Sequence, residues 1–386
     1  MNKIYMDNAA TTAVSPTVLE KMLPYFTQVY GNASSIHATG REAHKVIDGV
    51  RRQVADAIGC TPSEIYFTGG GSESDNWAIK GAAFARQKKG NHIITSSIEH
   101  HAGLHTCQWL EKHGFQVTYL PVDEYGQVRP EDVEKAITDK TILITIMAAN
   151  NEIGTLQHVK EIGKIAKAHG IWFHTDAVQA MGAVPVNVED WGVDMLSMSA
   201  HKFHGPKGVG ALYIRKGVRP DIFMQGGAQE RGQRAGTENL AGIVGLGAAL
   251  EEAVANLDNY TARLTKLRDK LINVILEAIP ECRLNGHPTN RLPNNVNVSI
   301  RYIEGEALLL RLDLAGVAAS SGSACTSGSL DPSHVLLAIG LPHEIAHGSL
   351  RLSLGTETTE EEVDEVLKVL PNIVSTLRAM SPLYHQ

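Results

Sequence analysis

The chain has 386 residues, of which 43% are hydrophobic, so it is long enough to bury a large core and to form two domains. Its formal net charge of −7, with no long run of Lys or Arg, argues against direct nucleic-acid binding. The N-terminus lacks the apolar core of a signal peptide, and no stretch approaches membrane-spanning length. We therefore expect a cytoplasmic protein with no membrane partner.

Strand and helix patterns alternate through the first half of the chain. A polar segment at 7–15 precedes a predicted helix at 16–29, a loop at 30–37 and a second helix at 41–58. Short apolar runs, each followed by a helical pattern or a turn, then predict strands at 65–67, 92–95, 116–120, 141–147, 171–174, 193–198 and 209–214. This alternation predicts an α/β fold with a mostly parallel sheet covered by helices.

The pattern changes in the last third of the chain. A long helical pattern at 238–278 is expected to link a large domain to a smaller α/β domain with strands near 296–300 and 350–354 and helices near 305–313 and 359–380. We predict a large ligand-binding domain at 15–256 and a small C-terminal domain at 257–386, joined by the N-terminal segment 1–14.

Two charged residues follow predicted buried strands. Asp176 follows the run at 171–174, and Lys202 follows the run at 193–198. In sheets of this class, ligands bind at the carboxyl ends of the strands, where both residues are expected. A lysine alone would more often lie on the surface. However, pyridoxal phosphate (PLP) chemistry requires a pair of residues: a lysine that forms a Schiff base and an aspartate that binds the pyridinium nitrogen.

A glycine turn between a strand and a helix predicts a phosphate site. Residues 67–76 read Phe-Thr-Gly-Gly-Gly-Ser-Glu-Ser-Asp-Asn, so that Gly71 and Ser72 stand at the expected helix start. Glycines let the backbone approach a phosphate, and the free N–H groups of a helix start favour an anion. Alternatively, Ser72 caps the helix with Asp75.

Three further polar residues are candidates for the same site. His100 follows the strand at 92–95 and can stack on a flat ring or move protons, although it can also be a hydrogen-bonded loop histidine. Asn151 follows a buried strand and offers an amide donor. Arg351 can bind a carboxylate bidentately, but an arginine in a strand is more often a surface residue.

Cys325 lies in an unusual run of small residues, 320–329, and we interpret it as a nucleophile on a mobile loop. The other cysteines, Cys60, Cys107 and Cys282, are far apart, and no CxxC spacing indicates a disulfide framework or a zinc ribbon.

A second motif, His343-Glu344-Ile345-Ala346-His347, matches the zinc-binding pattern of metalloproteases. Gly348 leaves barely one helical turn before the strand at 350–354, and no third ligand follows at a usual spacing. We therefore do not predict a metal site.

Taken together, the motifs resemble those of the PLP-dependent cysteine desulfurases of the NifS/IscS type over nearly the whole chain. The resemblance rests on DNAATT (7–12), SESDN (72–76), EH (99–100), NNEIG (150–154), DAVQ (176–179), SAHK (199–202), RAGTEN (234–239) and SGSAC (321–325). It implies PLP-dependent transferase fold type I, class V, and a homodimer.

The resemblance also implies a role for each matching residue. Lys202 would hold PLP, Asp176 its ring nitrogen and Gln179 its ring hydroxyl, while His100 would stack on the ring and move protons. The other implied roles are phosphate binding by Gly71, Ser72, Ser199, His201 and, from the other subunit, Thr237; substrate-carboxylate binding by Asn151 and Arg351; and persulfide formation on Cys325.

The implied reaction converts L-cysteine to L-alanine and passes sulfur to an iron–sulfur scaffold or another acceptor protein. Ser72 stands where a threonine is common, which preserves the hydroxyl, and the chain stops at Gln386 without the longer tail of housekeeping members. The alternatives are another PLP enzyme, such as an aminotransferase or a selenocysteine lyase-like protein, and a non-catalytic sulfur or metal carrier that uses Cys325, His343 and His347.

Overall fold

The computed structural model describes residues 3–322, 332–382 and 384. Its largest sheet has the strand order β2-β8-β7-β6-β5-β3-β4, and only β8 runs against its neighbours. The fold class expected from the alternating pattern, α/β with a mostly parallel sheet, is confirmed. The strands are β2 (Ile65–Thr68), β3 (His92–Ser96), β4 (Gln116–Leu120), β5 (Thr141–Thr145), β6 (Trp172–Asp176), β7 (Met195–Ser199) and β8 (Gly210–Ile214).

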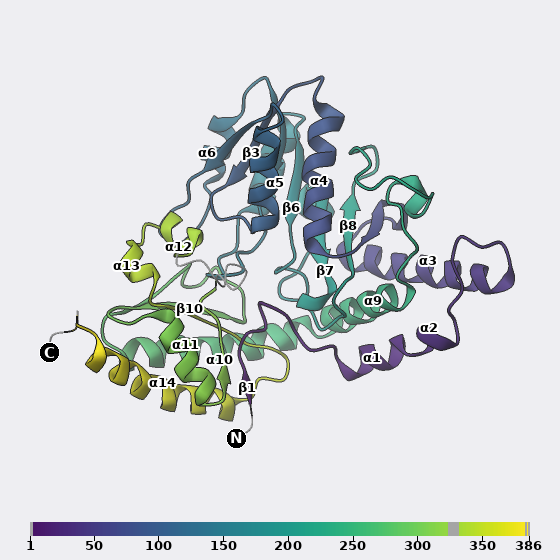
Figure 1. Ribbon diagram of the computed structural model, residues 1–386. Coiled ribbons are helices and arrows are strands. Elements are labelled where there is room, and N and C mark those ends of the chain that lie inside the picture. Colours follow the sequence, from purple (N-terminus) through teal and green to yellow (C-terminus); the bar gives the residue numbers. More distant parts are fainter. Residues whose placement is uncertain (1–2, 323–331, 383, 385–386) are drawn as a thin grey trace.

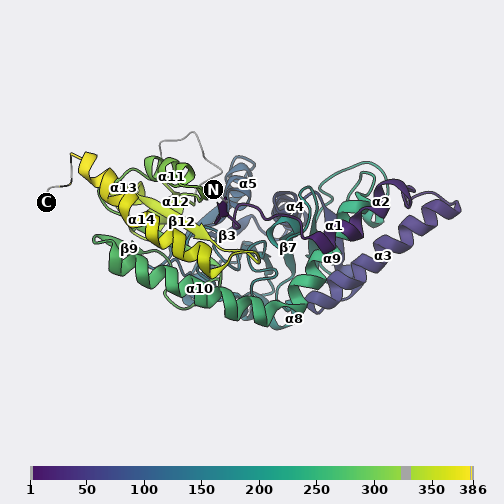
Figure 2. The same ribbon diagram turned by 90° about the horizontal axis from the view of Figure 1, so that it is seen from below.

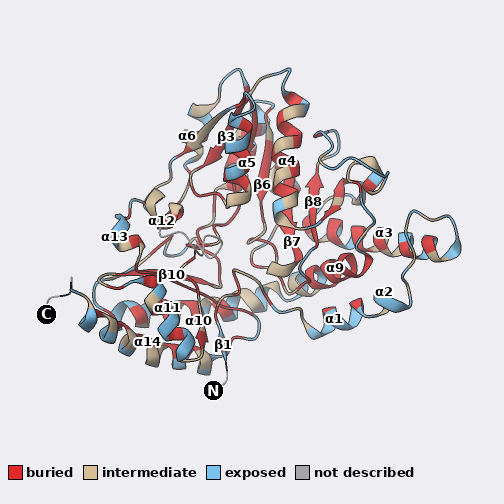
Figure 3. Ribbon diagram, in the orientation of Figure 1, coloured by how far each residue is buried: buried red, intermediate tan, exposed pale blue. Residues whose placement is uncertain are grey.

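Helices cover both faces of this sheet (Figure 1). Along β7, Met195 belongs to the core under α4 (Gly71–Arg86) and α5 (His101–Glu111), whereas Leu196 belongs to the opposite core under α3 (Ala38–Ile58), α7 (Val159–Ala168) and α9 (Leu240–Ala255). Successive side chains of a strand point to opposite faces of the sheet. Consecutive apolar residues are therefore needed to bury the sheet on both sides. Figure 3 shows the result as strands coloured as buried almost throughout. Short helices α6 (Pro130–Ala136) and α8 (Val188–Trp191) complete this part.

A second, smaller sheet lies in the C-terminal part of the chain, with the antiparallel order β12-β10-β9. Helices α10 and α14 run alongside each other beneath it (Figure 2). The elements are α10 (Leu257–Ala278), β9 (Cys282–Leu284), β10 (Asn295–Ile300), α11 (Gly305–Leu314), α12 (His334–Ala338), α13 (His343–Ala346), β12 (Ser349–Ser353) and α14 (Glu360–Met380). The division of the chain at residues 256 and 257 falls between α9 and α10 and stays a prediction.

The N-terminal segment first contacts the C-terminal part of the chain, which holds the small sheet, and then runs toward the large sheet. β1 (Ile4–Tyr5) pairs in parallel with β11 (Val317–Ala318), and Asp7 bridges to Ser353 of β12. The next residues, Ala9 and Ala10, therefore cross the space between the two sheets, which matters for the site described below.

Two expected helices are broken. The predicted helix at 16–29 is α1 (Pro16–Met22) and α2 (Pro24–Thr27), because Pro24 has no N–H to continue the hydrogen-bond ladder. The single long helix at 238–278 is also wrong: α9 and α10 meet at Asn256 with a bend of 71°. The Asn256 side chain donates to the carbonyl of Glu252 and so competes with the helical backbone. Within the described residues no single helix is long and apolar enough to cross a membrane, and only the bent α9–α10 pair meets that criterion when taken together.

Candidate active site

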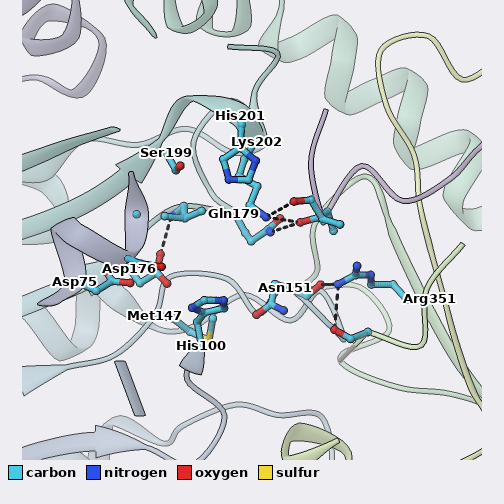
Figure 4. A pocket seen from close by; sticks show the side chains of 16 residues that line it. Asp75, His100, Met147, Asn151, Asp176, Gln179, Ser199, His201, Lys202 and Arg351 are labelled. Atoms are coloured by element: carbon cyan, nitrogen blue, oxygen red, sulfur yellow. Dashed lines mark hydrogen bonds between the residues drawn. The ribbon is translucent and has the colours of Figure 1, made fainter. Parts of the chain in front are cut away.

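A cavity of about 430 Å³ opens at the carboxyl ends of the parallel strands (Figure 4). Asp176 is the last residue of β6 and Ser199 the last of β7, while the start of α4 and the start of α5 form further walls. The structure thus brings together the predicted site residues Gly71, Ser72, His100, Asn151, Asp176, Gln179, Ser199, His201, Lys202 and Arg351, all of which line this cavity.

Two predicted residues are not part of this wall. Thr237 lies on an exposed loop before α9 and does not line the cavity. Cys325 lies outside the described residues. Gly322, three residues earlier in the sequence, does line the cavity.

Lys202 sits in a single 3-10 turn, Ala200–Lys202, directly after β7. Its Nζ donates hydrogen bonds to the carbonyl oxygens of Ala9 (2.7 Å) and Ala10 (2.8 Å). The surface alternative for this lysine is therefore wrong, because the N-terminal segment covers its ammonium group and the side chain lines the cavity.

The carboxyl group of Asp176 is buried at the end of β6. Burial raises its pKa to about 6, against the opposing effects of the hydrogen bond from the Val178 N–H (2.8 Å) and of nearby Lys202. A cation placed against this carboxyl would remove the cost of its burial and favour the ionised form. Gln179, three residues later, donates from Nε2 to the carbonyl of Ala9 (2.9 Å).

The glycine turn forms a cradle at the start of α4. Gly70 is the N-cap residue with φ of +148°, a conformation that favours glycine, and a Cβ on Gly71 would lie 2.7 Å from a methyl group of Val178. The alternative that Ser72 caps the helix is wrong, since the cap is Gly70 and Ser72 lies inside the helix on the cavity wall. Gly71 and Ser72, the first two residues of this 16-residue helix, line the cavity, and the N–H groups of a helix start favour an anion.

His201 and Ser199 face this cradle from the end of β7. The Nδ1 atom of His201 lies 3.1 Å from the Thr11 hydroxyl. Burial, Lys202 and Lys207 lower the pKa of His201 to about 4, so the ring is neutral at physiological pH and can donate one hydrogen bond.

His100 is the N-cap residue of α5, and its Nδ1 accepts the backbone N–H of Ala102 (3.1 Å). Burial, with smaller effects of Lys202, His334 and His105, lowers the pKa of His100 to about 4. The ring is therefore neutral, and because Nδ1 is an acceptor, its proton is on Nε2. The ring is thus a hydrogen-bonded histidine that also lines the cavity, and its role in stacking or proton transfer stays a prediction.

Arg351 in β12 is only 2% exposed, so the surface reading of this strand arginine is wrong. Its Nη2 donates to Asp7 Oδ1 (2.8 Å) and its Nη1 to the carbonyl of Asn151 (2.9 Å). Its buried Nε has no hydrogen-bond partner within the described part of the chain. An unused donor of a buried guanidinium at a cavity wall is suited to a carboxylate ligand.

Sequence reasoning missed several residues of the wall: Ala9, Ala10, Asp75, Met147, Val178 and Gly322. The position of Asp75 at the cavity could have been predicted, because Asp75 lies four residues after Gly71 and hence on the same face of α4. The N-terminal alanines belong to the DNAATT motif (7–12), but their place at the cavity could not be read from local pattern, since it depends on the pairing of β1 with the distant strand β11.

The zinc-like motif lies on α13, whose four residues, His343–Ala346, end before the second histidine. The prediction of barely one turn before the next strand is confirmed, since β12 begins at Ser349.

The chain is similar to known proteins in sequence and in fold. The family model for aminotransferase class-V matches residues 4–366. The chain is 62% identical over 380 residues to "Cysteine desulfurase IscS" of Methanosarcina thermophila, covering 98% of this chain and 94% of the relative. Among solved structures, it matches a "NIFS-LIKE PROTEIN" with a TM-score of 0.92 and 42% identity over 97% of this chain and 100% of the other. It also matches "SspA in complex with cysteine" with a TM-score of 0.81 and 41% identity, over 91% and 98% of the two chains.

These matches span nearly the whole chain, and their identities are far above the level at which only a fold is shared. The protein therefore belongs to the class-V aminotransferase family and, within it, to the cysteine desulfurases related to IscS and NifS.

Proposed function

We propose that the protein is a PLP-dependent cysteine desulfurase that converts L-cysteine to L-alanine and takes the sulfur onto Cys325 as a persulfide. The observation that carries the proposal is the shared cavity, whose wall includes a lysine, a buried aspartate, a neutral histidine and a buried arginine (Figure 4). Relatives that carry this activity in their names match the chain from end to end.

The chemistry of the cavity fits PLP at each of its parts. The glycine cradle and the start of α4 offer N–H groups to a phosphate, with the Ser72 and Ser199 hydroxyls and His201 beside them. Asp176 presents a buried carboxyl whose pKa burial raises, and a protonated ring nitrogen placed against it would favour its ionised form. Gln179 provides an amide for the ring hydroxyl, and Lys202 provides the amine for a covalent bond.

When bound, PLP supplies a sink for the electrons released at the Cα of an amino acid. The chain's own residues supply the rest. Arg351 and Asn151 bind the substrate carboxylate and so fix which bonds at Cα can react. Lys202 Nζ and His100 Nε2 exchange protons with the substrate carbons.

The sulfur step needs a nucleophile outside the described cavity wall, and Cys325 is our candidate. Its thiolate forms an S–S bond with the substrate sulfur while the substrate Cβ–S bond breaks, and the electron pair of that bond stays with the carbon skeleton. Protonation of the skeleton yields alanine, so that cysteine and an enzyme thiol become alanine and an enzyme persulfide. No additional oxidant or reductant is needed.

The remaining thiols are poor candidates for this step. Burial raises the pKa of Cys60 and of Cys282 to about 12, and buried Cys107 is shifted in the same direction. Thiols of this kind remain protonated at neutral pH and are weak nucleophiles.

The persulfide would then be transferred to an acceptor protein, for which an iron–sulfur scaffold is the leading candidate. We place the protein in the cytoplasm, with no direct role for nucleic acid.

A homodimer with shared sites is part of the proposal. The loop that carries Thr237 is tied to the phosphate cradle, because Arg234 donates to both carboxylate oxygens of Glu73 (2.8 and 3.0 Å) and Glu73 accepts the N–H of Gly69. Thr237 itself is exposed and lies off the cavity wall of its own chain. Such a residue is available to the phosphate of a second copy.

We expect Thr237→Ala to weaken PLP binding roughly tenfold, the effect of one lost hydrogen bond to a charged group. Thr237→Ser is the matched control and should bind PLP normally.

A hybrid dimer tests whether Thr237 acts in the other subunit. The dimer combines one Lys202→Ala chain with one Thr237→Ala chain, so a role of Thr237 in the other subunit leaves one site with native Lys202 and native Thr237. Titration should then find one site of native affinity per hybrid dimer. Finding none would show that Thr237 acts within its own subunit.

A transaminating enzyme is the alternative that the same cavity could support. The test is to incubate the yellow holoenzyme with L-cysteine and no keto acid, and to follow alanine. Catalytic alanine formation supports a desulfurase. Alanine formation that depends on a keto acid, or transfer of the amino group to one, would support an aminotransferase instead.

A further inference from the structure

A second buried carboxyl group lies beside Asp176 on the cavity floor (Figure 4). It belongs to Asp75, which α4 places one turn after Gly71 and which is only 2% exposed. No role for Asp75 follows from cofactor or substrate binding as described so far.

Within the described part of the chain, no lysine or arginine forms an ion pair with the Asp75 carboxyl group. Its nearest basic group is His174 of β6, whose Nε2 lies 3.6 Å from Asp75 Oδ1. That imidazole is only 1% exposed, and burial lowers its pKa to about 3, so it is neutral at physiological pH. Its two nitrogens are already engaged by Thr145 Oγ1 (2.8 Å) and Ser197 Oγ (2.9 Å).

The other groups that face Asp75 are neutral or acidic. The Ser197 hydroxyl of β7 contacts the carboxyl, and the acidic groups that act on it are Asp176 of β6 and, more weakly, Glu99, which follows β3. Burial raises the pKa of Glu99 to about 8, so Asp176 is the main negative charge near Asp75 at physiological pH. The Oδ1 atom has no hydrogen-bond partner among the described residues. A buried carboxylate beside another carboxylate, with no cation paired to it, is strongly disfavoured relative to the neutral acid. Burial, Asp176 and Glu99 accordingly raise the pKa of Asp75 well above its usual value.

We propose that Asp75 is a protonated, neutral carboxylic acid whose role is to keep Asp176 as the one carboxylate opposite the cofactor's ring nitrogen. Asp75 is thus a positioning residue that acts through Asp176, and the inference rests on the proposed role of Asp176 toward PLP. A charged Asp75 would repel the Asp176 carboxylate and add a second negative charge to the cofactor pocket. An apolar residue would leave Ser197 without its carboxyl contact.

The first readout is the infrared signal of the protonated carboxyl group in the full-length holoenzyme labelled with isotopic aspartate. We expect a protonated aspartate band that persists at pH 8 and is absent from Asp75→Asn. Asp258→Asn, on the exposed face of α10, is the control and should leave the band unchanged. A holoenzyme without a protonated aspartate at pH 8 would overturn the proposal.

The second readout is the pH midpoint of the visible absorption of the lysine-bound cofactor. Because asparagine is neutral and has nearly the same shape, Asp75→Asn should move this midpoint by less than about 0.3 unit, whereas loss of a native negative charge would lower it by about one unit or more. Asp75→Ala should instead weaken PLP binding, and Asp75→Asn should restore it. A large midpoint shift in Asp75→Asn contradicts the proposal.

If Asp75→Asn does not fold, Ser197→Ala serves to assign the band, since it removes the hydroxyl that contacts Asp75 while leaving the acid in place. The band should then change frequency, and a band that ignores this change belongs to another residue and overturns the assignment. A chain that binds no PLP would contradict the proposed function, whereas the infrared band still reports on Asp75.

Discussion

Lys202→Ala is expected to abolish turnover and to remove the visible absorption of the lysine-bound cofactor. Within the described cavity wall, Lys202 is the residue with an amine that can bond covalently to PLP, and it stands opposite the buried carboxyl of Asp176. Loss of a group that takes part in every chemical step costs several orders of magnitude in rate.

Two further variants separate this chemistry from folding. Lys202→Arg keeps a cation near the Ala9 and Ala10 carbonyls but cannot form the covalent bond, so it should be as inactive as the alanine variant. Lys216→Ala, an exposed lysine at the far end of β8, should behave like the parent. A Lys202→Ala protein with the parent spectrum and activity would place the cofactor lysine elsewhere.

Cys325→Ser is expected to bind PLP and cysteine normally and to fail at the sulfur step. The hydroxyl is a far poorer nucleophile toward sulfur than a thiolate, so alanine formation should fall by several orders of magnitude. Spectra recorded before and after addition of cysteine should still change, because the residues that line the described cavity are untouched.

Cys60→Ser is the matched control, because it makes the same exchange at a thiol whose burial keeps it protonated. It should retain the parent rate. A Cys325→Ser enzyme that releases alanine and sulfur at the parent rate would leave a generic PLP lyase in place of the proposed desulfurase.

Local features of the sequence were sufficient to predict where Asp176 and Lys202 lie in the fold. Each follows an apolar run of strand length, and the carboxyl ends of parallel strands meet at one edge of the sheet, so the site followed from local pattern. The glycine turn before α4 was predictable for the same reason, since Gly70 adopts a positive φ at the point where a strand gives way to a helix.

Other features depend on contacts between distant segments. The burial of Arg351 requires β12 to lie against Asp7 and Asn151, which are remote in sequence. The break at Asn256 was hidden because apolar periodicity continues on both sides of it, and a single side-chain hydrogen bond to Glu252 marks the bend. The burial of Asp75 beside Asp176, without a cationic partner among the described residues, likewise arises only when α4, β6 and β7 pack together.

The central claim is that sulfur leaves cysteine by way of an enzyme persulfide. The most direct measurement is a single anaerobic turnover of the holoenzyme with L-cysteine, with alanine and protein-bound sulfur quantified separately. The account predicts equal amounts of alanine and protein-bound sulfur, with the sulfur absent from the Cys325→Ser protein. Alanine accompanied only by free sulfide, with no sulfur on the parent protein, would contradict it.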